Sequence, residues 1–395
     1  MNILFVLYVW GESNSSIHAS CLAQALHRFG HHCMIAGPGE GEAEITLTRG
    51  GRGAPMRTFE QVERQLRDGT LFPDGRGADV YHAWTPREAV RQYLEQIMPI
   101  SPGMLVVHME DHEDELVKHF LGRPAYLRAK TGLWTQRFPD TLMHPVLGHQ
   151  FIAGADGVSM LVEAMQSLLP AGKAHTVVWP AADDRIYFPR PPNIHLRNLL
   201  GISDETVLLV YTGNGHPANY TEIRSLYLAV HLLNRRGIPT RLVRTGVDFF
   251  AMEPGYREWA DEYSIELNRI PRRTCLGDLL STADVLVQPG VPGPFNDVRF
   301  PSKLPEFFAS GRPVVLPRSN IGLETRHLRD AYVVDRADGP SIAAAVETIA
   351  GNPELKHTLA LGSRAFYEEH FSWDKSAGIV DRFYLKFLKN HTPGG

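Results

Sequence analysis

The chain contains few cysteines and no long apolar run. Its three cysteines, Cys21, Cys33 and Cys275, are too few and too scattered among 395 residues to form a disulfide framework or a structural zinc site. The apolar N-terminus has no charged leader and breaks at residues 10–12 (WGE), which predicts a buried strand and not a signal peptide. No stretch approaches the roughly 20 apolar residues that span a bilayer, so we expect a cytoplasmic protein with at most peripheral membrane contact.

The chain also lacks a strong excess of charge of either sign. Its 40 lysines and arginines against 44 acidic residues give a formal net charge of −4, without the basic excess of a general nucleic-acid binder. The hydrophobic share of 43% and charged share of 21% are ordinary globular values. The length favours two domains.

Short apolar runs alternate with helix-length amphipathic segments in both halves, which is the pattern of parallel sheets with helical crossovers. In the first half the predicted strands are 3–8, 33–36, 80–83, 105–108 and 157–161, with a helix over 17–29. In the second half they are 206–212, 240–245, 265–268, 285–288, 313–316 and 331–334, with a helix over 222–235. The restart follows a proline-rich segment at 187–192, which predicts an α/β fold with two Rossmann-like domains.

Several short motifs lie at the ends of these segments. The first half holds DVYHAW at 79–84 and VVH at 106–108, and the second holds ADVLVQP at 283–289 and PSKLPEFFASGRPVV at 301–315. Together with FSW at 371–373, these motifs and their order resemble the GT-B glycosyltransferases, most closely the retaining glycosyltransferase family 4. The block at 301–315 is the most specific part of a resemblance that extends over nearly the whole chain.

The resemblance implies two facing Rossmann-like domains with a cleft between them, the GT-B architecture. Residues 1–188 and a returning helix at 373–395 would bind the acceptor, and residues 189–372 would bind the donor. The implied reaction moves a sugar from a nucleotide-diphosphate sugar, with UDP or GDP, to a glycan, lipid or small-molecule acceptor. It proceeds with retention and needs neither a metal nor another cofactor, since a departing phosphate oxygen takes the proton of the acceptor.

The resemblance also assigns three catalytic residues. His108 would face the sugar from a strand end, and Glu306 would bind the ribose hydroxyls. Asp297 would face the sugar in place of the family's first glutamate, which falls on Val298 here. Structural roles stay open for all three: a packed core histidine, a first-turn acid and a loop aspartate.

A short helix is predicted over 302–310, with Ser302 at or near its N-cap and amides free to bind an anion. Lys303 in its first turn opposes the helix dipole, which is easier to explain beside a bound phosphate than as a solvated lysine. Arg299, just upstream, is a second candidate cation.

The remaining residues of the predicted donor site follow strand ends or lie beside this helix: Gly11, Gly213, Asn214, Arg244, Ile270, Arg272 and Leu304. Gly11 would let a ligand approach the backbone closely. The arginine and lysine that many members of the family place after the first strand of the donor domain are absent from residues 212–219 (TGNGHPAN). Arg244 is the candidate replacement, unless it forms a salt bridge elsewhere.

Two segments leave alternatives open. The run HMEDHEDE at 108–115 collects imidazoles and carboxylates, but its spacing is not that of a helical zinc site, and acids are favoured at the start of the next helix, so no metal is expected. The stretch 112–150 mixes basic and aromatic side chains, which suits an acidic or glycan acceptor, a peripheral membrane contact or a helical pair packed on the first domain.

Two rival functions remain beside a retaining transferase. The same fold serves an inverting GT-B transferase or a nucleotide-sugar epimerase. The family residues that are missing here also leave room for a non-catalytic protein that binds nucleotide or glycan.

Overall fold

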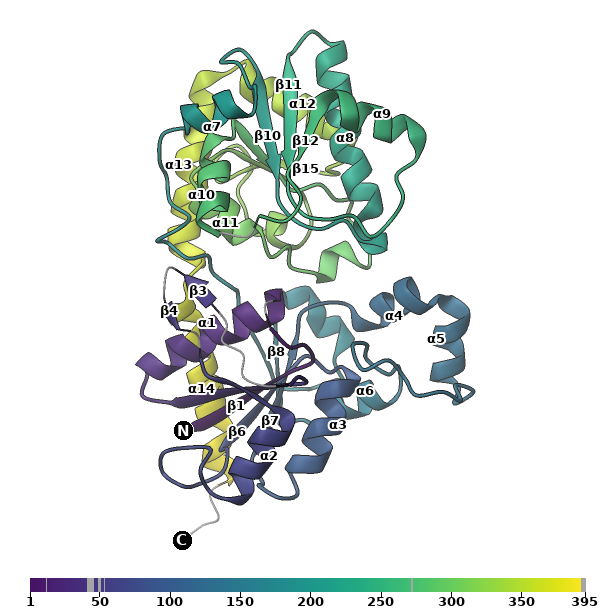
Figure 1. The fold of residues 1–395 in the computed structure, drawn as a ribbon, viewed down its shortest axis with the longest axis vertical. Coiled ribbons are helices and arrows are strands. Elements are labelled where there is room, and N and C mark those ends of the chain that lie inside the picture. Colours follow the sequence, from purple (N-terminus) through teal and green to yellow (C-terminus); the bar gives the residue numbers. More distant parts are fainter. Residues whose placement is uncertain (12, 41–45, 49–50, 53, 271–272, 392–395) are drawn as a thin grey trace. The chain divides into compact units, whose positions relative to one another are not determined.

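The structure is a computed structural model that describes residues 1–11, 13–40, 46–48, 51–52, 54–270 and 273–391. Contacts between residues divide the chain into two compact units, which we call unit 1 (Met1–Pro180 and Ser372–Gly395) and unit 2 (Ala181–Phe371). Each unit has its own sheet and its own apolar core (Figure 1).

Unit 1 contains a parallel sheet whose described strands run in the order β5-β2-β1-β6-β7-β8-β9. These strands are β1 (Asn2–Leu7), β2 (His32–Gly37), β5 (Met56–Thr58), β6 (Val80–Trp84), β7 (Met104–Met109), β8 (Gly157–Met160) and β9 (His175–Val177). A separate antiparallel pair consists of β3 (Thr46–Thr48) and β4 (Gly51–Arg52). The central strands β1, β6 and β7 are buried along their whole length, which explains their continuous apolar runs.

Helices cover both faces of this sheet (Figure 1). The helical segments of unit 1 are α1 (Asn14–Arg28), α2 (Phe59–Arg67), α3 (Glu88–Ile97), α4 (Glu113–Leu121), α5 (Arg123–Lys130), α6 (Leu147–Gly154), η1 (Glu163–Leu168) and α14 (Trp373–His391). Ser13 starts α1 with a capping box, since its Oγ accepts from the amide of Ser16 at 3.1 Å. Helix α14 packs beside α1 and adds Ala377, Val380 and Tyr384 to the core.

Unit 2 contains a second parallel sheet, in the order β12-β11-β10-β13-β14-β15. Its strands are β10 (Val207–Tyr211), β11 (Thr240–Arg244), β12 (Ser264–Glu266), β13 (Val285–Val287), β14 (Val314–Pro317) and β15 (Tyr332–Val334). Its helical segments are α7 (Ile194–Leu199), η2 (Pro217–Asn219), α8 (Tyr220–Arg235), α9 (Pro254–Tyr263), α10 (Arg273–Thr282), η3 (Asn296–Val298), α11 (Leu304–Ala309), η4 (Asn320–Leu323), α12 (Gly339–Ala350) and α13 (Pro353–His370).

Both sheets have the strand order of a doubly wound fold. The chain reverses direction across the sheet between β1 and β6 in unit 1 and between β10 and β13 in unit 2. Ligands of such sheets bind at the carboxyl ends of the strands, beside this reversal. A ligand-binding site is therefore expected at the loops that follow these four strands.

The predicted strands are confirmed to within a few residues at each end. Most of them lie in buried parts of the two sheets, whereas β12 at a sheet edge is only half-buried or exposed. The short outer strands β5 and β9 were not predicted, since three residues at a sheet edge carry little apolar pattern. Residues 181–188, which the sequence analysis assigned to the first domain, fall in unit 2. There the Tyr367 hydroxyl donates to the carbonyl oxygen of Ala182 at 3.1 Å.

Of the described helices, none combines the length and the apolar character that a membrane span requires.

Candidate functional site

His108 lies near the carboxyl end of β7 and is completely buried. Its ring stacks on the indole of Trp84 at the end of β6, with ring centroids 3.8 Å apart. The Trp84 Nε1 donates to Glu110 Oε1 at 2.8 Å, and Ser15 Oγ in α1 donates to Glu110 Oε2 at 2.5 Å. These four residues form a compact group at the carboxyl end of the unit 1 sheet, which we call the edge cluster.

The edge cluster combines a neutral imidazole with a carboxylate. Burial lowers the pKa of His108 to about 4, although the charge of Glu110 opposes this shift. Burial alone would raise the pKa of Glu110, but His18, His108 and Ser15 outweigh it and lower this pKa to about 2. His18 Nδ1 lies 3.6 Å from Glu110 Oε1. At neutral pH the cluster therefore offers one negative charge and one uncharged ring.

Glu110 was not predicted to belong to the site, because the acids of 108–115 were expected at the start of a helix. The helix α4 begins only at Glu113, and Glu110 precedes it. The spacing of His108 and Glu110 could have indicated that both belong to the site. Residues two apart on a strand point to the same face, and Glu110 follows His108 by two positions. Glu113 is buried against Arg87, whose Nε lies 3.1 and 3.2 Å from the two carboxylate oxygens.

Gly11 lies in the turn that follows β1, four residues before Ser15 of the edge cluster. No close neighbour requires a glycine at this position. Its φ of 81° is unfavourable for other residues, and a Cβ at this position would meet no atom within 4 Å. The shape of the turn, and not crowding within the protein, accounts for the glycine.

Lys303 projects over the end of β10 in unit 2. Its Nζ lies 3.3 Å from the Tyr211 hydroxyl and 3.3 Å from Gln288 Oε1, and 4.6 Å from the centre of the Tyr211 ring. Among the residues that the structure describes, no carboxylate oxygen lies within 4.0 Å of this ammonium group. The half-buried Lys303 thus has neutral partners only.

Two glycine turns support the position of Lys303. Gly213 has a φ of 132°, and a Cβ there would lie 3.2 Å from Lys303 Cε. Gly246 has a φ of 99°, and a Cβ there would lie 2.4 Å from the Gly213 carbonyl oxygen. Asn214 is exposed, and its Oδ1 accepts from the Val247 amide at 2.9 Å. The turns after β10 and β11 therefore pack backbone against backbone beside Lys303.

Two of the three arginines of the predicted donor site, Arg244 and Arg299, have carboxylate partners within unit 2. Arg244 is 3% exposed, donates to Asp248 Oδ2 at 2.7 Å and to the Tyr227 hydroxyl at 2.8 Å, and also contacts Asp248 Oδ1. Arg299 Nη2 donates to both oxygens of Glu222 at 2.6 Å. These ion pairs account for both arginines without a ligand, so their phosphate role stays a prediction.

The helix predicted over 302–310 begins later than expected. Lys303, and not Ser302, occupies the N-cap of α11, and the Leu304 amide closes a tight turn onto the Pro301 carbonyl oxygen at 2.9 Å. Pro305 belongs in the first turn, where its missing N–H is not required. Because α11 spans only six residues, the charge of Lys303 and not a long helix dipole is the main attraction for an anion. Glu306 is half-buried in the first turn.

The remaining predicted residues are spread along the same end of the unit 2 sheet. Leu304 is fully buried in the core. Asp297 is half-buried in η3, and Val298 beside it is buried. Ile270 is half-buried in the loop after β12, and Arg272 lies outside the described residues. Helix η3 is tied to η4 because Asn320 Nδ2 donates to the Asn296 carbonyl oxygen at 2.8 Å.

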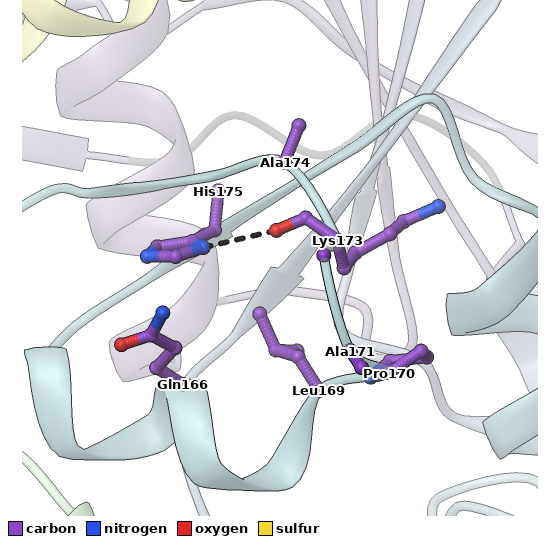
Figure 2. A pocket seen from close by; sticks show the side chains of 8 residues that line it. Gln166, Leu169, Pro170, Ala171, Lys173, Ala174 and His175 are labelled. Carbon is purple, nitrogen blue, oxygen red and sulfur yellow. Dashed lines mark hydrogen bonds between the residues drawn. The ribbon is translucent and has the colours of Figure 1, made fainter.

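A hollow of about 370 Å³ lies elsewhere in unit 1, around the loop that joins η1 to β9 (Figure 2). It is lined by Gln166, Leu169, Pro170, Ala171, Gly172, Lys173, Ala174 and His175. His175 Nδ1 bonds to the Lys173 carbonyl oxygen at 3.0 Å. None of the predicted site residues lines it, so it carries no functional argument. Within the described ranges, no group of three or more histidine, cysteine or acidic side chains is arranged to hold a metal ion.

No protein-family model matches the sequence, and no curated protein matches it. Solved structures match it over nearly their full length. HepE of Anabaena in complex with UDP-glucose is 14% identical, with a TM-score of 0.68 over 99% of this chain and 100% of that chain. Sucrose-phosphate synthase of Thermosynechococcus elongatus is 16% identical, with a TM-score of 0.69 over 98% and 99%.

A glycosyltransferase of Rickettsia africae is 11% identical, with a TM-score of 0.66 over 98% of this chain and 99% of that chain. At such low identity the likeness concerns the fold. The predicted GT-B architecture is confirmed at this level: the chain has the two-domain α/β fold of these glycosyltransferases.

Proposed function

We propose that the protein is a glycosyltransferase that takes a sugar from a nucleoside diphosphate sugar. The single observation that carries this proposal is Lys303, a half-buried cation with neutral partners only, placed over Gly213 at the carboxyl end of β10. A nucleotide-sugar donor leaves as a diphosphate, whose developing negative charge needs such a cation. Uridine is the first base to test, because HepE, which shares the fold, was solved with UDP-glucose.

Within this proposal, Lys303 binds the diphosphate and Glu306 binds the ribose hydroxyls. Both belong to the same short segment at the start of α11, and both are half-buried. The charge of Lys303 takes the place of a metal ion, so we propose a metal-independent reaction. Asp297, in the half-buried turn η3, is proposed to bind a hydroxyl of the donor sugar.

We assign the edge cluster of unit 1 to the hydroxyl groups of the reacting sugar. An aromatic ring, an imidazole and a carboxylate together supply an apolar surface, a hydrogen-bond donor and acceptors. With pKa values near 4 and near 2, His108 and Glu110 are poor bases at neutral pH. This favours a retaining reaction, in which a departing phosphate oxygen takes the acceptor proton and no protein base is needed.

We further propose that the segment α4–α5 contacts an anionic membrane surface, which favours a lipid-linked acceptor. No acidic residue occurs from 116 to 139. Phe120, Leu127 and Leu133 are 56%, 57% and 70% exposed, and the exposed cations beside them are Arg123, Arg128 and Lys130. Exposed apolar and basic side chains on short helices bind an anionic interface by burial and by charge.

Vesicle sedimentation tests the membrane contact. The protein should pellet with phosphatidylglycerol vesicles and remain in solution with phosphatidylcholine vesicles. Replacing Phe120, Leu127 and Leu133 by serine should abolish pelleting. Binding that is unchanged in this variant would refute the assignment.

Thermal-shift measurements and product analysis test the transferase proposal. A bound ligand raises the melting temperature by mass action, so UDP or GDP should stabilise the protein, and EDTA should not remove the effect. With an acceptor present, the nucleotide sugar should be consumed, and NMR should show the anomeric configuration retained. Inversion would point to the inverting reaction, donor turnover without acceptor to an epimerase, and binding without turnover to a non-catalytic protein.

A further inference from the structure

A continuous chain of buried side chains leads from α14 to His108. The Tyr384 hydroxyl lies 2.7 Å from His82 Nδ1, His82 Nε2 lies 2.8 Å from Ser159 Oγ, and Ser159 Oγ lies 2.8 Å from His108 Nδ1. All four side chains are completely buried. We call this chain the relay. It crosses from the C-terminal helix through β6 and β8 to the end of β7.

The four side chains of the relay carry one more polar hydrogen than the number of hydrogen bonds that they form with one another. Burial lowers the pKa of His82 well below its ordinary value and that of His108 to about 4, and burial raises the pKa of Tyr384 well above its ordinary value. Each ring and each hydroxyl therefore carries one hydrogen at neutral pH. Four hydrogens serve three bonds, so one hydrogen must point outside the relay or go unpaired.

The position of that extra hydrogen depends on the direction in which the relay is polarised. In one arrangement Tyr384 donates to His82, His82 donates to Ser159, and Ser159 donates to Nδ1 of His108. The extra hydrogen then lies on Nε2 of His108. In every other arrangement it lies on the hydroxyl of Tyr384 or of Ser159. Among the described residues, neither hydroxyl has a hydrogen-bond partner beyond the relay itself.

The Nε2 end is the place where a ligand can accept this hydrogen. In the structure His108 Nε2 is a buried polar atom with no hydrogen-bond partner. It belongs to the edge cluster, beside the Trp84 ring. A buried donor without an acceptor is costly, whereas an oxygen atom of a bound sugar would satisfy it. The Ser159 hydroxyl, in contrast, lies between two rings, and the Tyr384 hydroxyl is bonded to His82, two residues before the end of β6.

We infer that the relay fixes His108 as the tautomer protonated on Nε2, which donates a hydrogen bond to an oxygen atom of the bound sugar. In this arrangement Tyr384 acts through His82 and Ser159 and is a positioning residue. The identity of the ligand rests on the function proposed above, but the tautomer does not. His108 then selects a sugar oxygen that accepts a hydrogen bond, and it does not remove a proton.

Nitrogen NMR reads the tautomer directly, on the full chain labelled with ¹⁵N-histidine at pH 7. The signals of His108 are identified by their loss in His108→Gln. We expect Nε2 of His108 to be protonated and Nδ1 to be unprotonated in the wild-type protein. In Tyr384→Phe and in Ser159→Ala the relay is interrupted, and both should show a mixture of the two tautomers.

A matched control uses another buried tyrosine of unit 1. The Tyr81 hydroxyl donates to the Ser101 carbonyl oxygen at 2.5 Å, outside the relay, so Tyr81→Phe should leave the His108 tautomer unchanged. Melting temperatures establish that each variant is folded. A wild-type spectrum with Nδ1 protonated would overturn the inference, as would one spectrum common to the wild type and both relay variants.

Kinetics separate this inference from the transferase proposal. His108→Gln keeps an N–H donor and should retain at least tenfold more kcat than His108→Leu, while Tyr384→Phe should lower kcat several-fold without changing KM for the donor. If the wild type shows the expected tautomer but no transfer, the proposed function fails and the relay stands. If it transfers sugar with Nδ1 protonated, the inference about the relay fails alone.

Discussion

The carboxyl ends of the two sheets differ in the sign of their charge and in how that charge is compensated by neighbouring side chains. In unit 1, Glu110 accepts hydrogen bonds from Trp84 and Ser15, and the neutral His108 Nε2 is a buried polar atom without a hydrogen-bond partner. In unit 2, Lys303 faces a hydroxyl and an amide oxygen only, and its positive charge is not compensated by a described neighbour. A neutral donor suits a sugar oxygen, whereas an uncompensated cation suits phosphate. Under the proposed function, the two ends would recognise different parts of a nucleotide sugar.

The largest expected effect concerns Arg244, which separates structural from ligand-binding cations in unit 2. Because Arg244 is buried against Asp248 and Tyr227, Arg244→Met should lower the free energy of unfolding by about 3 kcal/mol in urea titrations. Its effect on nucleotide affinity should be small. Arg257→Met is the control, since its ion pair with Asp261 is exposed and should contribute less than about 1 kcal/mol. Normal stability with lost nucleotide binding in Arg244→Met would restore Arg244 to the donor site.

Removing the uncompensated cation tests the other side of the comparison. Lys303→Ala should weaken the binding of nucleoside diphosphate by roughly 10- to 100-fold, and that of the bare nucleoside hardly at all, because the charge is assigned to phosphate. Calorimetry measures both. Lys356→Ala is the control, since this lysine of unit 2 is already bonded to Asp284 at 2.6 Å. If Lys303→Ala binds diphosphate normally, the assignment of the donor site is wrong.

Acidification tests the neutral state of His108. Its pKa is about 4 in the folded protein and near 6.5 in an unfolded chain. Its stabilisation is fully present above pH 6.5 and is lost as the pH falls toward 4, because the unfolded chain binds the proton first. From pH 7 to pH 5 the free energy of unfolding should fall by on the order of 2 kcal/mol more in the wild type than in His108→Gln. Equal losses in urea titrations of the two proteins would contradict a neutral, buried His108.

The smallest expected effect concerns Glu306. Glu306→Gln keeps the size of the side chain and removes its charge, so it should weaken nucleoside and nucleoside diphosphate alike, each by about tenfold. The ratio between the two ligands should stay constant, in contrast to Lys303→Ala. A loss confined to the diphosphate would move Glu306 from the ribose to the phosphate region.

The sequence was sufficient to predict the elements that are buried on both faces. Strands such as β1 and β10 are continuous apolar runs because their neighbours cover them completely, and His108 was found because it ends such a strand. The N-cap of α11 lies one residue after Ser302, because the turn that starts at Pro301 outweighs the N-cap preference of serine.

Contacts between segments that are far apart along the chain could not be predicted from the sequence. Arg299 meets Glu222 from 77 positions away, and Tyr384 meets His82 from 302 positions away. No local pattern reports such a pair, because each depends on how strands and helices are ordered in the finished unit. The position of a single strand-end residue such as His108 was therefore easier to predict than the groups that contact it.

Unit 1 is discontinuous, and this has a consequence for the order in which the chain can fold. Residues 1–180 leave the ribosome before unit 2, but α14, which completes the unit 1 core beside α1, follows unit 2. Unit 2 is continuous and can fold as it emerges, while unit 1 keeps an apolar face open until α14 arrives. Exposed apolar surface promotes aggregation during synthesis. We therefore expect that unit 2 can be expressed alone, whereas a fragment of residues 1–180 would need α14 supplied through a linker.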